Sequence, residues 1–167
     1  MKRFLFILMF FKFLHLFAQE SNSRKCNLIY EVDTIGLSKT GIVNLNITNK
    51  ELYGLKLSDI FHEVYIQPIN VEKSENKSNI FYETSKSISD VNCLDCFGKF
   101  KNVKPNKTIS YSINLDESKF FKKVLSSRST KYRFNIWFDT IDLLKNSTKS
   151  KCYVGSFTSD KIIYTTK

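Results

Sequence analysis

The sequence predicts a mostly β protein with one short helix, built from antiparallel strands. Three observations lead to this expectation. Apolar and polar side chains alternate with a period of two in several segments, turn-like stretches separate these segments, and no stretch is long enough for the helical crossovers of an alternating α/β fold. Successive side chains of a strand point to opposite faces of its sheet. Each alternating segment therefore describes a strand with one buried face and one solvated face.

Three segments show the alternation most clearly, at residues 43–48, 108–115 and 132–139. In the third, Trp137 breaks the pattern, because its parity places it with Arg133 on the polar side of the strand. Weaker strand candidates are predicted at 28–33, 53–57, 64–69, 80–83, 97–103, 152–157 and 161–165.

One segment has helical spacing instead. Residues 120–125 place four apolar side chains on one side of a helix of about two turns. Asp116 precedes this segment and is our candidate for its cap, whereas Lys122 and Lys123 suit its last turn. The segment 57–63 is compatible with either a helix or a strand.

The later strands resemble those of immunoglobulin-like domains. A turn that contains Pro105 leads into the alternating strand 108–115, and a connection then leads to Tyr132, Phe134 and Ile136 at every second position. The resemblance covers about a third of the chain and implies an antiparallel immunoglobulin-like β-sandwich or a related Greek-key barrel. It implies no particular activity, because such sandwiches serve unrelated functions.

The N-terminus predicts export. Residues 1–3 carry positive charge, residues 4–11 contain no polar side chain, and Ala18 offers a small residue for cleavage. We expect a signal peptide over residues 1–18. Cleavage after Ser23 and retention as an uncleaved membrane anchor are the alternatives. Residues 19–167 are then expected to form a single β-sandwich-like domain in the periplasm, at the cell surface or outside the cell.

Basic residues are concentrated in the second half of the chain. The formal net charge is +10, and residues 99–167 contain fifteen Lys and Arg against five Asp and Glu. This asymmetry predicts a basic surface that attracts anionic partners, with a purely solvating role as the alternative. The candidate anion-binding residues are Lys99, Lys101, Lys104, Lys107 and Arg133, and Lys122, Lys123, Arg128 and Lys131 are candidates for extending the same surface.

The cysteines predict structural disulfides. An exported chain with four cysteines allows three pairings, of which we favour Cys26–Cys152 together with Cys93–Cys96. The spacing of Cys93 and Cys96 is also that of a thiol–disulfide exchange site. Such a site usually opens a helix, which lowers the thiol pKa, whereas residues 97–100 are predicted as a strand.

No motif for catalysis, a metal ion or a cofactor is recognisable. His62 is the only histidine after residue 18, and it lies between Asp59 and Glu63 in the sequence. A general base is conceivable there, but no nucleophile accompanies it, so we interpret His62 as an ordinary surface histidine. The glycines occur singly and form no phosphate-binding loop. We therefore expect no enzymatic activity, no metal site and no cofactor.

Trp137 is a candidate partner-binding residue. If the polar face of its strand is solvated, an indole beside Arg133 offers a stacking platform for a sugar or a protein partner. The alternative is that the predicted helix or a loop covers it.

Three functions are compatible with these observations. The first hypothesis is an exported, non-enzymatic β-sandwich domain that binds an unknown protein or an anionic glycan at the cell envelope or outside the cell. The second is a cationic module that docks on anionic polysaccharide or on a membrane surface. The third is a thiol–disulfide or other enzyme that uses Cys93 and Cys96. Nucleic acid is not an expected partner, and any membrane association is expected to be peripheral.

Overall fold

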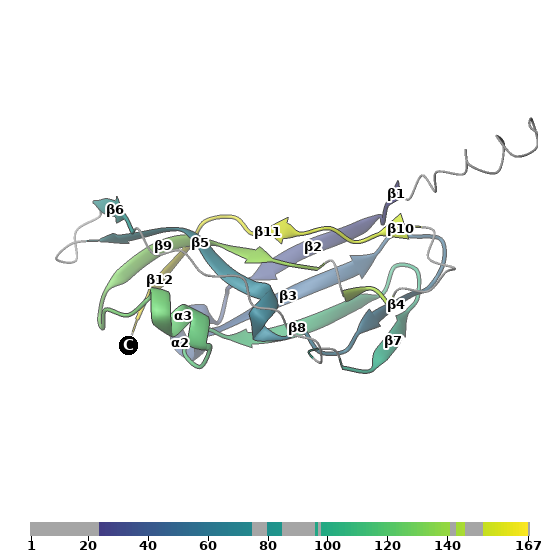
Figure 1. The fold of residues 1–167 in the computed structure, drawn as a ribbon, viewed down its shortest axis with the longest axis horizontal. Helices are drawn as coiled ribbons and strands as arrows, with labels where there is room; N and C mark the ends of the chain where they lie inside the picture. Colours follow the sequence, from purple (N-terminus) through teal and green to yellow (C-terminus); the bar gives the residue numbers. More distant parts are fainter. Residues whose placement is uncertain are drawn as a thin grey trace, which may run out of the picture.

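The computed structural model describes residues 24–74, 80–84, 96, 98–140, 143–145 and 152–166. The predicted signal peptide, both of its cleavage sites and Cys93 lie outside these residues. Most of the described residues form strands, which pair mainly in the antiparallel sense and are accompanied by short helical turns (Figure 1). The prediction of a mostly β fold is confirmed.

One larger sheet has three antiparallel strands in the order β2-β3-β8. β2 spans Leu28–Asp33, β3 spans Ile42–Asn49 and β8 spans Thr108–Asn114. In β3, buried and half-buried residues alternate along the whole strand, as the period of two predicts. The other face carries polar cross-strand pairs such as Ser110 with Asn46, whose side chains lie 2.7 Å apart.

The other larger sheet is organised around β9, which spans Lys131–Phe138. β5 (Ile66–Ser74) pairs with one edge of β9, and β6 (Phe81–Glu83) pairs with β5. β11 (Phe157–Thr158) and β12 (Ile162–Thr165) pair with successive parts of the other edge.

Two small sheets complete the strands. β4 (Leu55–Ser58) pairs antiparallel with β7 (Phe100–Val103), and β1 (Arg24–Lys25) pairs parallel with β10 (Cys152–Tyr153). In Figure 1 these strands lie toward one end of the molecule, whereas β6 lies toward the other.

The segment with helical spacing forms α3, which spans Lys119–Val124. The ring of Phe121 lies 5.9 Å from that of Phe134 on β9, so the helix packs on the apolar side of this strand. The expectation that Asp116 caps the helix is wrong, because Ser118 is the N-cap residue. Asp116 instead accepts a hydrogen bond from the hydroxyl of Tyr164, a partner 48 residues away that local sequence does not indicate.

Two further helical turns are not predicted by the sequence. α2 spans Leu37–Thr40 and the 3-10 turn η1 spans Glu63–Tyr65. α2 ends at Gly41, whose φ of 73° lies in the left-handed region that favours glycine.

Both larger sheets contribute their apolar faces to one hydrophobic cluster. Tyr30 on β2 stacks on Phe157 on β11 with ring centroids 4.9 Å apart, which brings the two sheets into contact. The hydroxyl of Tyr111 on β8 donates to the carbonyl oxygen of Ser58 on β4 at 2.6 Å, and burial raises the pKa of this hydroxyl. This hydrogen bond anchors the β4–β7 pair to the core.

Candidate functional site

β1, β4, β7 and β10 lie toward one end of the molecule (Figure 1), and these strands and their adjoining turns carry many basic residues. We call this region the basic end and define it as residues 24–25, 49–59, 99–107, 143–145 and 152–153. Its cations come from separate stretches of sequence: Arg24, Lys25, Lys50, Lys56, Lys99, Lys101, Lys104, Lys107 and Lys145.

Asn49, the last residue of β3, holds two turns of the basic end together. Its fully buried side-chain amide donates to the carbonyl oxygens of Tyr53 at 2.9 Å and Val103 at 2.8 Å. Its backbone N–H donates to the carbonyl oxygen of Lys107 at 3.0 Å. The turn after β3, which carries Lys50, therefore lies beside the turn between β7 and β8.

The β4–β7 pair presents further cations on its outer side. Lys56 is exposed, whereas its neighbours Leu55 and Leu57 are buried. The N–H of Lys145 donates to the carbonyl oxygen of Lys56 at 3.0 Å, and the ammonium group of Lys145 lies 5.9 Å from the ring centroid of Phe100 on β7. Residues 143–145 thus add a cation beside the small sheet.

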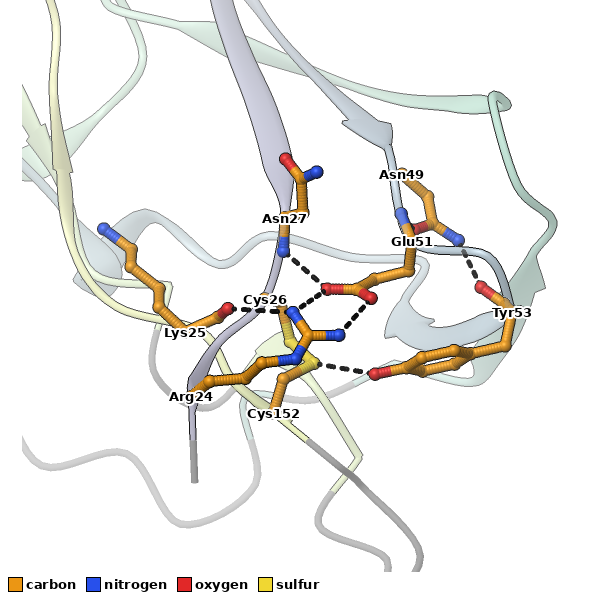
Figure 2. Close-up of polar contacts among 8 residues, drawn as sticks. All are labelled: Arg24, Lys25, Cys26, Asn27, Asn49, Glu51, Tyr53 and Cys152. Atoms are coloured by element: carbon orange, nitrogen blue, oxygen red, sulfur yellow. Dashed lines mark hydrogen bonds and ion pairs between the residues drawn. A yellow bond between two sulfur atoms is a disulfide. The ribbon is translucent and has the colours of Figure 1, made fainter. Parts of the chain in front are cut away.

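The carboxylates within the basic end are those of Glu51 and Asp59, and both are paired. Asp59 forms an ion pair with Lys101 at 3.6 Å. The side chain of Glu51 is only 4% exposed, and it accepts hydrogen bonds from Arg24 at 2.8 and 2.6 Å and from the N–H of Asn27 at 2.7 Å (Figure 2). Within the described residues of this end, no carboxylate remains to neutralise the other lysines.

The hydrogen bond from Arg24 lowers the pKa of the Glu51 carboxyl, and the N–H of Asn27 acts in the same direction against the opposing effect of desolvation. A lowered pKa means that the carboxylate stabilises the fold above its unfolded pKa of about 4.3. That stabilisation is lost as the pH falls through the folded pKa.

We expect Glu51→Gln to lower the free energy of unfolding at pH 7 by about 1–3 kcal/mol, because Arg24 and the N–H of Asn27 lose a charged acceptor that is itself buried. The difference from the unsubstituted protein should shrink as the pH falls below the unfolded pKa of about 4.3 and then through the lower pKa of the folded carboxylate. Urea unfolding at several pH values measures both effects. Glu31→Gln, at an exposed site on β2, is the control and should change little. A difference that is independent of pH would contradict the role assigned to the charge.

Arg133 does not belong to the basic end. It lies on β9, where its guanidinium binds Glu72 on β5 and stacks 4.4 Å from the ring centroid of Phe81 on β6. Lys161 binds the same carboxylate at 2.8 Å. The sequence predicts that Arg133 groups with the lysines of residues 99–107. The structure separates them, because strand order places Arg133 on β9 and those lysines on and beside β7.

The remaining predicted cations also lie away from the basic end. Lys122 and Lys123 are exposed on α3, and Lys131 opens β9 with its ammonium group 5.8 Å from the ring centroid of Phe81. Arg128 is exposed in the segment between α3 and β9. The basic half of the sequence therefore divides between two regions of the fold.

Trp137 occupies the face of β9 that its parity predicts. It is half-buried, and its register partners are Gln67 on β5 and Thr158 on β11. The helix α3 packs against Phe134 on the opposite face of the strand, so it does not cover the indole. Trp137 lies outside the basic end.

The cysteines of the described residues carry no free thiol. Cys26 and Cys152 form a disulfide, the pairing that the sequence analysis favoured (Figure 2). Cys96 is buried, and Cys93 lies outside the described residues. The hydroxyl of Tyr53 donates to the sulfur of Cys152 at 3.4 Å, which links the disulfide to the turn after β3.

His62 has a local structural role. It precedes η1, and its Nδ1 accepts a hydrogen bond from the N–H of Val64 at 3.3 Å. Among the described residues, no three His, Cys, Asp or Glu side chains are grouped so that they could hold a metal ion. None of the helices in this part of the chain has the length and apolar character needed to cross a membrane.

Glu51 and Asn49 are the important residues of the basic end that sequence reasoning missed. The partners of Glu51 are Arg24 and Asn27, which lie 27 and 24 residues away. Asn49 reaches across 54 residues to Val103. No local sequence motif indicates such contacts, because they depend on how the strands are arranged.

Comparison with protein-family models, with curated proteins and with solved structures finds no match.

Proposed function

We propose that this protein is an exported, non-enzymatic binding domain that docks on an anionic surface through its basic end. The gathering of lysines from separate stretches of sequence, at an end whose described carboxylates are already paired, is the observation that supports the proposal. The N-terminal sequence pattern supports export to the periplasm, the cell surface or the extracellular space.

The chemistry of such an end favours binding over catalysis. Several positive charges that do not neutralise one another create a local field, which attracts anionic groups and accelerates their encounter with the protein. Lys104 and Lys107 project from a turn that Asn49 fixes in place, so docking requires little ordering of the backbone. An anionic glycan and an anionic lipid surface share the chemistry that this end would recognise.

We also propose that the domain is an immunoglobulin-like sandwich. The order β2-β3-β8 in one sheet and β6-β5-β9-β12 in the other supports this, since each sheet combines strands that are distant in the sequence. The Cys26–Cys152 disulfide then joins the beginning of the domain to its late strands. In this arrangement the basic end lies at one end of the sandwich and includes the connections between β3 and β4 and between β7 and β8, a position that binding loops commonly occupy.

Retention on immobilised heparin, used as a model polyanion, tests the proposed function. We expect the mature protein to be retained at low salt and released at about 0.3 M salt, where the Debye length falls to about 6 Å. Uncharged agarose is the control matrix and should retain nothing. Passage through heparin at low salt, or retention that persists in about 1 M salt, would exclude charge-driven docking.

A further inference from the structure

We infer that the basic end docks on an anionic lipid bilayer, with Leu52 inserted among the head groups. The inference rests on the proposed function and names the surface that the basic end recognises. Its specific evidence is an exposed apolar side chain in the turn between β3 and β4, a segment that also carries Lys50 and Lys56 of the basic end.

The turn after β3 directs a carboxylate inward and an apolar side chain outward. Glu51 is buried against Arg24 and Asn27, whereas Leu52 is 96% exposed. Asn49 fixes this arrangement, because its side-chain oxygen accepts the N–H of Glu51 at 2.9 Å and its amide donates to the carbonyl oxygen of Tyr53 at 2.9 Å. The buried acidic residue is the unusual part of this arrangement, and its pairing with Arg24 leaves Leu52 as the outward-facing side chain of the turn.

An exposed aromatic ring accompanies Leu52 at this end. Tyr153 on β10 is 51% exposed and pairs in register with Lys25 on β1. Tyrosine is favoured at the interface between membrane and water, because its ring is apolar and its hydroxyl remains hydrated. Lys25 pairs with Tyr153 across the two strands, and Lys50 lies close to Leu52 in the sequence. The ammonium groups of both lysines suit anionic head groups.

The chain also enters the fold at this end. Arg24, the first residue of β1, is preceded by residues 19–23 and by the apolar segment predicted as a signal peptide. During export, this short stretch connects the basic end with a segment that is itself bound for the membrane. This covalent connection favours the basic end, rather than α3, as the part of the domain nearest the bilayer during export.

A lipid surface explains the basic end better than a polysaccharide does. Lysines alone account for attraction to either polyanion, but an exposed leucine gains nothing from a hydrated sugar chain. In a bilayer interface it is removed from water, and peripheral binding is strengthened by this burial in addition to the electrostatic attraction.

Co-sedimentation with phosphatidylcholine vesicles that contain about one third phosphatidylglycerol tests the inference. We expect the mature protein to bind these vesicles and Leu52→Ser to bind about tenfold more weakly, the loss that corresponds to one partly buried leucine. Ile35→Ser is the matched control, since Ile35 is 92% exposed in the turn after β2, outside the basic end. Vesicle binding by that variant should not change.

Heparin retention separates this inference from the proposed function. Leu52→Ser should keep the salt-dependent retention of the unsubstituted protein, because no charge is altered. If the protein binds heparin but not the vesicles, or if Leu52→Ser binds vesicles normally, the lipid inference is wrong and anionic docking stands. If neither ligand is bound at low salt, both proposals fail.

Insertion can also be followed directly. Trp137 is the only tryptophan, so Trp137→Phe/Leu52→Trp provides a single reporter at the turn, and Trp137→Phe/Ile35→Trp provides its control. Brominated lipids should quench the reporter at position 52 and leave the one at position 35 unaffected. Equal quenching at both positions would overturn the insertion of Leu52.

Discussion

Removal of the Cys26–Cys152 disulfide is expected to cost roughly 2–5 kcal/mol of folding free energy. The two cysteines are separated by 126 residues, so the bond closes a loop that includes nearly the whole domain. Closing a long loop restricts the unfolded chain strongly, and this restriction disappears in the variant Cys26→Ala/Cys152→Ala. Alanine is preferred to serine, because both positions are buried and a hydroxyl would need a partner.

The loss should appear as a fall of about 10 °C in the unfolding temperature, measured by circular dichroism under oxidising conditions. Cys93→Ala/Cys96→Ala is the control, since the pairing predicted for these residues closes only a tight loop and contributes about 2 kcal/mol at most. A smaller effect for Cys26→Ala/Cys152→Ala than for the control would contradict the assigned role of the long-range bond.

Cys26→Ala/Cys152→Ala should also destabilise the pairing of β1 with β10 at the basic end. β1 and β10 are two residues each, and beside the disulfide the N–H of Cys26 donates to the carbonyl oxygen of Tyr153 at 2.8 Å. Such a short pair has little stability of its own. Faster hydrogen exchange in residues 24–26 of the variant would accompany the global loss.

Much of the fold follows from periodicity in the sequence. The segment 28–33 is predicted as a strand and becomes β2 with the same bounds, and β9 follows the predicted segment closely, with Trp137 on the expected face. The period of two suffices for this, because it records which side chains each sheet buries. Strand order is not encoded in this local signal, and so the position of Arg133 relative to the lysines of residues 99–107 could not be predicted.

The candidate site was predictable only in part. The lysines around Pro105 are visible as a charged turn, but their proximity to Lys50 and Lys56 depends on the contacts of Asn49 and on the β4–β7 pair. The pairing of Glu51 with Arg24 spans 27 residues and leaves no local pattern. Long-range hydrogen bonds therefore determine which charges are neutralised and which remain available for binding.

Reversal of three charges at the basic end is expected to abolish docking. The variant Lys56→Glu/Lys104→Glu/Lys107→Glu replaces exposed cations from β4 and from the turn between β7 and β8. Each lysine near an anionic surface contributes about 1 kcal/mol, so affinity should fall at least about a hundredfold. Lys101 is left unchanged, because a glutamate at that position would face Asp59.

The fold should tolerate this change. The three side chains are exposed and form no ion pair with a described carboxylate, and surface charges contribute little to stability. Lys119→Glu/Lys122→Glu/Lys123→Glu on α3 is the matched control, because it alters the net charge by the same amount outside the basic end. A general effect of net charge would weaken both variants equally.

The affinity of these two triple variants for an anionic surface at low salt, measured side by side, tests the role of the basic end most directly. Docking through the basic end predicts that the variant at Lys56, Lys104 and Lys107 loses binding, whereas the variant on α3 retains most of it. Equal losses in the two variants, or unchanged binding by the first, would contradict a docking surface at the basic end.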